Sequence, residues 1–542
     1  MTSDTDRIAT IARELEAARL SPADAAAAFA AAAEHRGGLS GRRSDGAYFT
    51  DADVARWLAR RAILGLLLEE AGVPDADVEV LLAHGGDQVS ALVARVADDP
   101  RCADAVAARL GSIRVLDPTC GAGSFLVAAL EVLVDVRHAL GREDVALDGA
   151  QLTGVDIDPD ARAACAKVLE LELAAAGVPG RVTVLGGDAE AASVLPQADV
   201  VIGNPPFVRA GATAVHGDLA TAPVGNRAAW IVERSLAVGS PGARIAFVLP
   251  VSVACTSAFV PVRNAWSSAC DVTFAAHFDT VPAALFADAV QRVTLLEGRA
   301  RVEGSAGSRW YTTRYHRWLR SEREGLLDRV RFVPLPGHGV DGSIAKVGTP
   351  LETHLLDALF AHPPAGRWHA PRQVGTSANA VLYKRRWSYF LLFTDFVPGI
   401  WDADGALREP TELKTLYVRD AVDARVLLAA YSSSLFWWYF SVFTDNRNVN
   451  RRDLAAFPIP DLQPGDAEEL AALADELMVA LRACSELRTC TYRSIGTITN
   501  TYFRQGATRP VVDRIDRVLV RAYGLSAEQL EFVLGFERRF RS

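Results

Sequence analysis

Between residues 112 and 250, five short runs of mostly apolar and β-branched residues alternate with helical stretches. The runs read SIRVLD, LTGVDID, VTVLGGD, DVVIGN and ARIAFVLP, and a turn follows each of them. Strands that alternate with helices in this way predict a parallel sheet covered by helices on both faces.

The remaining sequence predicts further domains, because a chain of 542 residues is too long for one compact core. Residues 1–45 are Ala-rich and predicted to be helical, and residues 46–300 hold the sheet. Past residue 300 the alternation stops, which predicts a connector over 301–345 and a loop-rich domain over 346–460. The proline-bearing segment FPIPDLQPGD then leads into a predicted helical region over 461–542.

The charge balance differs between the two halves of the chain. The net charge of −9 argues against a protein that coats nucleic acid over its whole surface, but it allows a local basic cleft. Up to residue 300 there are 25 Lys and Arg against 38 Asp and Glu (−13), and after it 32 against 28 (+4). The basic excess therefore lies in the C-terminal half.

Cysteine usage and hydropathy indicate a cytoplasmic protein. The seven cysteines are scattered and form no CxxC pair, so neither a disulfide framework nor a metal cluster is expected. The N-terminus MTSDTDRIATIARELEAARL lacks the apolar centre of a signal peptide. Val426–Phe443 is uncharged over about 18 residues, but its serines and crowded aromatics favour a buried helix over a membrane span.

The first strand tip carries a glycine-rich turn. In a parallel α/β sheet ligands bind at the carboxyl ends of the strands, and here DPTCGAGSFL (117–126) follows the first strand. Gly121 and Gly123 allow close approach of a ligand to the backbone, and the helix from Ser124 offers a positive N-terminus. Packing is the alternative role of this turn. Its spacing is not GxGxxG, which disfavours a plain NAD site.

The next two tips carry acidic residues. Asp156 lies where a carboxylate accepts hydrogen bonds from ribose hydroxyls, whereas Asp158 is expected to cap the following helix. Asp188 follows the third strand and is placed to accept a hydrogen bond from an adenine amino group. A single acidic residue at a strand tip is commonly a cap, but three in succession favour a bound nucleoside.

The fourth strand ends in NPPF (204–207), a stiff and polar corner. The Asn204 side-chain oxygen and the Pro205 carbonyl are two acceptors able to hold the hydrogens of a planar amine. Pro206 stiffens the backbone, and Phe207 offers an apolar face on which an extruded base stacks. The alternative is a double-proline turn that only closes the strand.

Taken in order, these motifs resemble the gamma-class DNA adenine-N6 methyltransferases of restriction-modification and phage-defence systems. The matching segments are GAYFT (46–50), DPTCGAGSFL (117–126), GVDID (154–158), GD (187–188) and NPPF (204–207). Weaker similarity continues through FVLP (247–250), LFADAV (285–290) and the end segment IDRVLVRAYGLSAEQL. Ala189 departs from the family, which often has a bulky residue there.

The resemblance implies a fold. It is an α/β, Rossmann-like sheet of the S-adenosylmethionine-dependent methyltransferases over 46–300, with helices N-terminal to it. A C-terminal α+β target-recognition domain over 346–460 and a helical tail are expected to follow.

The resemblance also implies site residues, with S-adenosyl-L-methionine as cofactor. The expected cofactor contacts are Tyr48, Thr50, Asp117, Pro118, Cys120, Gly121, Gly123, Asp156, Ile157 and Asp188. Tyr48 and Thr50 would lie beside the methionine end, although Thr50 also suits a helix N-cap. Asn204, Pro205, Pro206 and Phe207 would be catalytic. Phe286 would close the other side of the base, with core packing as its alternative role.

Double-stranded DNA is the expected partner, because such an enzyme must flip its base and hold the rest of the site. The candidate DNA contacts are Lys384, Arg385 and Arg386, beside Trp387, and Arg447, Asn448, Asn450, Arg451 and Arg452. Arg and Asn suit the edges of guanine and adenine, and solvated charge is the alternative. The sequence shows no PD…(D/E)xK nuclease pattern, so any restriction or defence partner is expected to be a separate polypeptide.

Three other functions remain open. Asn-Pro-Pro-aromatic motifs also serve methyltransferases that act on RNA bases or on protein glutamine amides, since each of these substrates presents a planar nitrogen. The long, basic-leaning C-terminal half disfavours those two. The third is a DNA-binding protein on an inactive methyltransferase scaffold, and the intact DPTCGAGSFL and NPPF motifs disfavour it.

Overall fold

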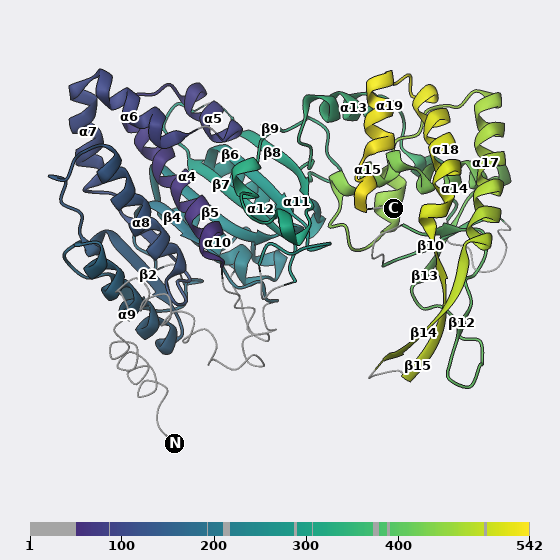
Figure 1. Ribbon diagram of the computed structural model, residues 1–542, viewed down its shortest axis with the longest axis horizontal. Helices are drawn as coiled ribbons and strands as arrows, with labels where there is room; N and C mark the ends of the chain where they lie inside the picture. Colours follow the sequence, from purple (N-terminus) through teal and green to yellow (C-terminus); the bar gives the residue numbers. More distant parts are fainter. Residues whose placement is uncertain are drawn as a thin grey trace. The chain divides into compact units, whose positions relative to one another are not determined.

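The chain forms two compact units, residues 1–335 and 336–542 (Figure 1). The computed structural model describes residues 50–85, 87–191, 193–209, 217–286, 290–305, 307–371, 379–386, 391–492 and 496–540. The predicted helical segment 1–45, Tyr48 and Trp387 lie outside these residues.

The first unit is built on a nine-stranded sheet with the order β3-β2-β1-β4-β5-β7-β6-β8-β9. Its strands are β1 (Val115–Asp117), β2 (Leu152–Asp156), β3 (Thr183–Gly186), β4 (Ala198–Gly203), β5 (Gly239–Pro250), β6 (Cys270–Phe278), β7 (Val293–Ala300), β8 (Arg309–His316) and β9 (Val333–Pro334). Each of the five predicted runs forms one strand, β1 to β5, and neighbours among these five pair in parallel. β7 runs antiparallel between β5 and β6. The predicted α/β fold class is confirmed.

The central strands have fixed register because both of their faces are buried. Val115 of β1 pairs with Leu152 of β2 and with Val200 of β4. Every residue of β4, β6 and β7 is buried, which requires cover on both faces of the sheet.

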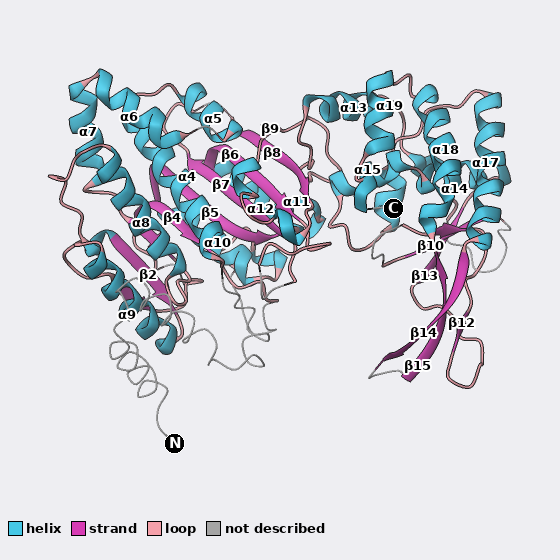
Figure 2. Ribbon diagram, viewed as in Figure 1, coloured by secondary structure: helices cyan, strands magenta, loops and turns pink. Residues whose placement is uncertain are grey.

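Helices supply that cover (Figure 2). They are α4 (Ala52–Glu70), α5 (Asp75–His84), α6 (Gln88–Asp98), α7 (Pro100–Leu110), α8 (Ser124–Ala139), α9 (Pro159–Ala175), α10 (Arg227–Val238), α11 (Ser252–Cys255) and α12 (Val260–Ala269). α4 packs against α8 and β5, and α10 packs against α12 and β5. The side chains of Val54, Leu58, Ile63 and Leu67 are among the buried residues of α4.

A buried charge network joins α4 to the sheet. Arg61 Nε lies 2.6 Å from Glu297 Oε2 of β7, with the two side chains only 4% and 1% exposed. Arg61 also donates to Leu82 O at 2.6 Å. The Arg61 guanidinium carbon lies 4.7 to 5.0 Å from the ring centroids of Trp57, Phe274 and Phe332. Burial lowers the pKa of Arg61, so its charge depends on Glu297 for compensation.

The sheet extends beyond the predicted boundary at residue 300. β8 pairs in parallel with β6, and β9 pairs with β8, so two strands come from the predicted connector 301–345. RWYTTRYH fell in the predicted connector because the alternation of strands and helices stops near residue 300, but its β-branched and aromatic residues suit a strand beside β6. The first unit ends at Leu335.

The second unit combines helices with two three-stranded sheets, β11-β10-β13 and β12-β15-β14. The helices are α13 (Pro350–Phe360), α14 (Ala421–Ser432), α15 (Ser434–Phe443), α16 (Arg451–Ala456), α17 (Pro464–Ala483), α18 (Arg509–Ala522) and α19 (Ala527–Gly535). The strands are β10 (Ala380–Lys384), β11 (Phe393–Thr394), β12 (Ile400–Trp401), β13 (Leu413–Tyr417), β14 (Ser485–Tyr492) and β15 (Gly496–Phe503).

The region predicted as helical, 461–542, contains a β-hairpin between α17 and α18. β14 and β15 pair antiparallel through Ser485↔Phe503 to Tyr492↔Gly496. Threonine recurs along both strands, and β-branched residues favour a pleated strand over a helix. The segments 346–460 and 461–542 also lie within one compact unit, because β12 pairs with β15.

The apolar segment Val426–Phe443 is buried as expected, but it forms two helices. α14 and α15 meet at Ser433 with an angle of 68° between them. Ser433 Oγ accepts a hydrogen bond from Phe436 N at 2.9 Å and so caps α15, whose ten residues are all buried. Among the described residues no single helix has the length and apolarity to cross a membrane. Taken together, α14 and α15 are long and apolar enough, but this rests on their length and composition only.

Replacing Glu297 with Gln should destabilise the first unit by about 3 kcal/mol, because Arg61 then keeps a buried charge without a counter-ion. Glu131→Gln is the matched control, since Glu131 pairs with Arg56 at 2.8 Å while 43% exposed. We expect less than about 1 kcal/mol there. Hydrogen exchange of α4 and β7 amides would measure both changes, and equal effects would contradict this role of Glu297.

Candidate active site

The carboxyl ends of β3, β2, β1 and β4 meet at one edge of the sheet. These strands are parallel neighbours, and the chain reverses its direction of travel across the sheet between β1 and β4. Such a reversal opens the crevice where α/β proteins bind ligands. The predicted motifs DPTCGAGSFL, GVDID, GD and NPPF all follow these four strands, so the structure brings them together.

The turn after β1 is tied to the tip of β2 by two backbone donors. Cys120 N donates to Val155 O, and Gly121 N donates to Asp156 Oδ2, each at 2.9 Å. Gly121 has φ +51°, and a Cβ added there would meet nothing within 4 Å. The space above Gly121 is therefore open to a ligand.

Gly123 has a different role from Gly121. It precedes α8 with φ +97°, and a Cβ there would lie 3.1 Å from Cys165 Sγ. Gly123 therefore permits packing of the turn on α9.

Pro118 and Cys120 lie on the protein side of the turn. Both are buried, and Cys120 is 5% exposed. A Cβ at Gly154 would lie 2.8 Å from Cys120 Sγ, which shows how closely the thiol packs against β2. In this structure the two side chains shape the turn, and their predicted contact with the cofactor stays a prediction.

The tip of β2 exposes an apolar side chain beside a carboxylate. Asp156 accepts hydrogen bonds from Gly121 N and Asp158 N, and burial raises its pKa. Ile157 is 62% exposed and so offers an apolar surface to a ligand. Asp158 caps α9 by accepting from Asp160 N at 2.9 Å, as predicted.

Arg162 supports this tip and was missed from the sequence. Its Nη1 donates to Asp156 O and Ile157 O, each at 3.0 Å. A Cβ at Gly186 of β3 would lie 3.0 Å from the Arg162 guanidinium carbon. Arg162 therefore packs between the tips of β2 and β3. An arginine near the start of a helix carries no sequence signal for such a role.

The tip of β3 is tied to α10 through Arg227, a second residue missed from the sequence. Asp188 Oδ1 accepts from Glu190 N at 3.0 Å, and Arg227 Nη2 lies 3.3 Å from Asp188 Oδ2. Arg227 also pairs with Glu190, and its backbone N donates to Val208 O at 3.0 Å. Arg227 thus joins the predicted adenine-binding loop to the NPPF segment. The neighbouring Ala189 is 5% exposed, so it fills a buried position.

Asp117 is a buried carboxyl at the centre of the site. It is 1% exposed and accepts from Thr119 N at 3.0 Å. Burial raises its pKa to about 8, the Thr119 hydrogen bond opposes this, and the charge of Asp156 adds to it. A Cβ at Gly203 would lie 2.8 Å from Asp117 Oδ1, so glycine before Asn204 lets the tips of β1 and β4 approach.

The NPPF segment is anchored by Thr50. Asn204 Nδ2 donates to Thr50 Oγ1 at 3.1 Å across 154 positions of sequence, and Thr50 is 8% exposed. The bond fixes the plane of the amide and with it the direction of its oxygen. Asp51, not Thr50, is the N-cap residue of α4, and it makes no capping hydrogen bond through its side chain.

The proline and phenylalanine residues of the site differ in exposure. Pro205 is buried, whereas Pro206 and Phe207 are half-buried, and Phe207 packs partly against the core. Phe286 is 3% exposed within the same core, which favours its packing role over base stacking.

In the second unit, the two predicted DNA-contact clusters lie together. Arg386 and Asn448 form an antiparallel bridge, and Val449 N donates to Arg385 O at 2.8 Å. Lys384, Arg385, Arg386, Arg447 and Arg451 are exposed, whereas Asn448 is half-buried. The structure therefore brings together basic segments that lie about 60 residues apart in the sequence. We call this the 386/448 surface, and its residues are Lys384, Arg385, Arg386, Arg447, Asn448 and Arg451.

Three of the predicted DNA contacts have partners within the protein, and one of them is Arg451, whose Nη2 donates to Ala370 O at 2.7 Å. Asp453 Oδ2 accepts from Asn450 N at 3.0 Å and from Asn450 Nδ2 at 3.1 Å, so this pair holds the start of α16. Arg452 pairs with Asp453 at 3.1 Å and with Asp341 at 3.5 Å. Contacts with DNA would compete with these hydrogen bonds and ion pairs.

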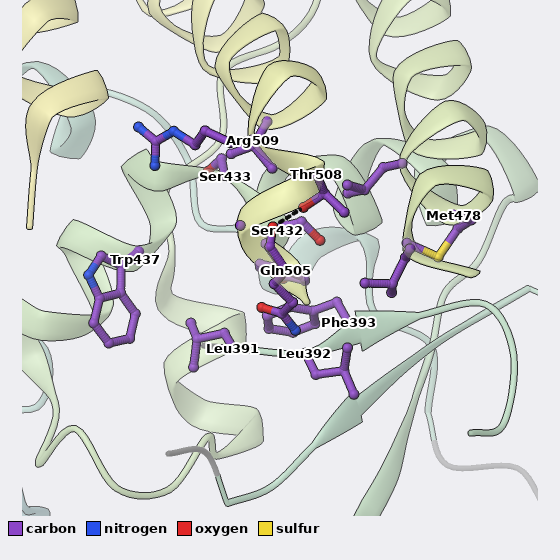
Figure 3. A pocket seen from close by; sticks show the side chains of 15 residues that line it. Leu391, Leu392, Phe393, Ser432, Ser433, Trp437, Met478, Gln505, Thr508 and Arg509 are labelled. Atoms are coloured by element: carbon purple, nitrogen blue, oxygen red, sulfur yellow. Dashed lines mark hydrogen bonds between the residues drawn. The ribbon is translucent and has the colours of Figure 1, made fainter. Parts of the chain in front are cut away.

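A cavity in the second unit contains none of the predicted residues (Figure 3). Its volume is about 610 Å³, including space open to solvent. It is lined by Leu391, Leu392, Phe393, Tyr431, Ser432, Ser433, Trp437, Leu477, Met478, Leu481, Gln505, Gly506, Thr508, Arg509 and Val512. Within the described ranges no cluster of His, Cys, Asp and Glu has the geometry to hold a metal ion.

Asp117→Asn should flatten the pH dependence of stability. In the unfolded chain an Asp ionises near pH 4. Because the folded carboxyl keeps its proton to about pH 8, unfolding releases a proton in between, and stability falls as pH rises through this window. Urea unfolding of both proteins from pH 4 to pH 8 would measure the difference. Parallel curves would show that Asp117 is ionised in the folded protein.

No family model and no curated protein matches this chain. A solved structure of the Type IIL restriction-modification enzyme MmeI in complex with DNA is similar over 96% of this chain and 82% of its own, with 12% identity and a TM-score of 0.56. The DNA-bound Type ISP enzyme LlaBIII matches 90% of this chain and 47% of its own at 10% identity and a TM-score of 0.41. The M protein of the Type I enzyme EcoKI matches 52% and 71% at 16% identity and 0.30. This chain therefore shares its fold, over nearly its whole length, with a restriction-modification enzyme.

Proposed function

We propose that this protein transfers a methyl group from S-adenosylmethionine to the N6 amine of a flipped adenine in double-stranded DNA, within a restriction-modification or phage-defence system. The observation that carries the proposal is the hydrogen bond from Asn204 to Thr50 at 3.1 Å, beside the open turn at Gly121. It orients an amide acceptor at the edge where four parallel strands end.

The chemistry requires acceptors that are oriented before the substrate arrives. The lone pair of an exocyclic aromatic amine is delocalised into the ring, so the nitrogen is a weak nucleophile. The Asn204 side-chain oxygen and the Pro205 carbonyl oxygen each accept one hydrogen of the amine and so localise the lone pair on nitrogen. Pro205 and Pro206 hold the backbone rigid, and Phe207 stacks on the base.

The cofactor fits the residues around the glycine turn. S-adenosylmethionine supplies an electrophilic methyl group when it is bound. Gly121 offers open backbone, Asp156 accepts hydrogen bonds from the ribose, and Ile157 offers its 62% exposed side chain to the adenine ring. Asp188 accepts from the adenine amino group, with Arg227 holding its other oxygen.

The 386/448 surface supplies contacts to the duplex. Its arginines and lysine neutralise phosphates, and Arg and Asn side chains read base edges. The shared fold with a restriction-modification enzyme solved in complex with DNA supports duplex DNA over RNA or a protein amide as substrate. A separate restriction or defence subunit would then act on DNA that lacks the methyl mark.

Asn204→Ala should abolish methylation, with a loss of about a thousandfold or more, because the amine loses one of its two oriented acceptors. The assay uses tritiated S-adenosylmethionine with mixed-sequence duplex DNA and identifies N6-methyladenine by mass spectrometry. Cofactor binding should change by less than about threefold, which separates a chemical from a binding defect. Label that appears only in RNA or protein would identify another substrate, and an unaltered rate would reject the role of Asn204.

Gly121→Ala should weaken S-adenosylmethionine binding at least about tenfold, because its methyl group would occupy the open space above the turn. Gly141→Ala is the control, since Gly141 has φ +62°, also meets nothing within 4 Å, and lies at the far end of α8. Both variants should lose a similar 1 to 2 kcal/mol, roughly, from backbone strain. Isothermal titration calorimetry would compare them, and equal affinities would place the cofactor elsewhere.

A further inference from the structure

The β14–β15 hairpin is mostly exposed, and Ile498 and Phe503 are its buried residues within the described part of the chain. The short strand β12 pairs with β15 at Thr499 and Asn500, and beyond these residues the hairpin continues toward its turn as a two-stranded ribbon. It extends away from helices α14, α17 and α18 within the second unit (Figure 2). Seven of the eight residues of β14 lie at the surface, and only Glu486 is half-buried. A ribbon that buries so little apolar area in its own chain gains little stability from its length.

One face of the ribbon satisfies its own polar groups. Cross-strand partners share a face, so Thr489 faces Thr499 and Thr491 faces Thr497. Their hydroxyls are hydrogen-bonded to one another at 2.9 Å and 3.0 Å. These pairs stiffen the ribbon and fix its register.

The other face presents an arginine opposite an asparagine. Arg488 pairs with Asn500 across the ribbon. The Arg488 guanidinium carbon lies 3.4 Å from the Tyr502 ring centroid, and its Nε donates to Glu486 Oε1 at 2.6 Å. Stacking and pairing together hold the planar guanidinium in one orientation on an exposed surface.

The charge of this segment opposes that of the whole chain. Residues 482–504 hold four Arg and one Glu, a balance of +3, whereas the chain carries −9. Arg482 pairs with Asp395 at the base of the hairpin, and Glu486 pairs with Arg488 and Arg504. The hairpin is thus a basic ribbon on an acidic protein, which favours a polyanionic partner.

We propose that the β14–β15 hairpin enters a groove of duplex DNA and reads base edges with Arg488 and Asn500. The proposal rests on the proposed action on DNA and adds a reading element outside the 386/448 surface. The major groove admits a two-stranded ribbon, where Arg pairs with guanine and Asn with adenine. The same face carries Cys490 and Ile498 next to Arg488 and Asn500. Its basic charge and its oriented guanidinium favour duplex DNA over a protein as the occupant.

The test compares two exposed arginines in the full-length protein by fluorescence anisotropy with labelled duplex DNA. Arg488→Ala should raise the Kd about tenfold and lower the slope of log K against log salt by about one. Arg514→Ala is the control, since Arg514 of α18 is 55% exposed against 52% for Arg488 and likewise pairs with a glutamate. The control should bind like the wild type.

A second pair of variants separates the contribution of positive charge to DNA affinity from the recognition of base edges. Arg488→Lys should retain the salt slope but relax the sequence preference, because ammonium lacks the two-donor fork. Asn500→Ala should change which sites carry methyl groups when genomic DNA from an expressing host is sequenced. Unchanged sequence preference in both variants would overturn the reading role.

The outcomes distinguish this proposal from the one it rests on. A wild type that neither binds nor methylates duplex DNA would reject the proposed function. A wild type that does both, with Arg488→Ala indistinguishable from it, would reject the hairpin assignment alone. Retained DNA affinity together with loss of a co-purified protein would assign the ribbon to a protein partner and also overturn the assignment.

Discussion

The parallel pairing of β1 with both β2 and β4 is the constraint on which the site depends. It aligns Val115 with Leu152 and Val200, so the three strands end at the same edge of the sheet. A register slip of one residue would turn buried side chains to the opposite face and misplace every tip. The ion pair between Arg114 and Asp199, with Nη2 to Oδ1 at 3.0 Å, ties the start of β4 to the residue preceding β1. The polar groups of the motifs lie in the loops that directly follow these strands.

Packing and ligand access impose separate demands on the glycines of this edge. Gly121 leaves open space, whereas Gly123, Gly154 and Gly203 admit the side chains of Cys165, Cys120 and Asp117. Of these four glycines only Gly121 leaves open space for a ligand. The others allow β1, β2, β4 and α9 to approach closely enough for the tips to form one site. This close packing buries Asp117, and burial disfavours the charged form of its carboxyl group.

Two long-range interactions join the site to the rest of the first unit. Thr50 orients the Asn204 amide from the segment before α4, and α4 is itself held to the sheet through Arg61 and Glu297. Arg227 joins the loop at Asp188 to the backbone at Val208. The NPPF segment and the loop at Asp188 are therefore positioned by side chains outside both, as the proposed reaction with its prearranged acceptors requires.

The sequence by itself determined the five central strands, the four motif-bearing tips and the cap at Asp158, because these depend on local periodicity and on residues adjacent in the chain. It also placed Asn204 and Gly121 at the same edge, since parallel strands end together. Only the tertiary structure decided that β8 belongs to the sheet, that residues 485–503 form a hairpin, and that Arg386 lies beside Asn448. It alone showed that Asp453 binds Asn450 and Arg452. Charge and β-propensity are local properties of the sequence. The partner of a side chain, however, often comes from a segment that is distant in the sequence, and residue spacing does not encode which distant segments meet.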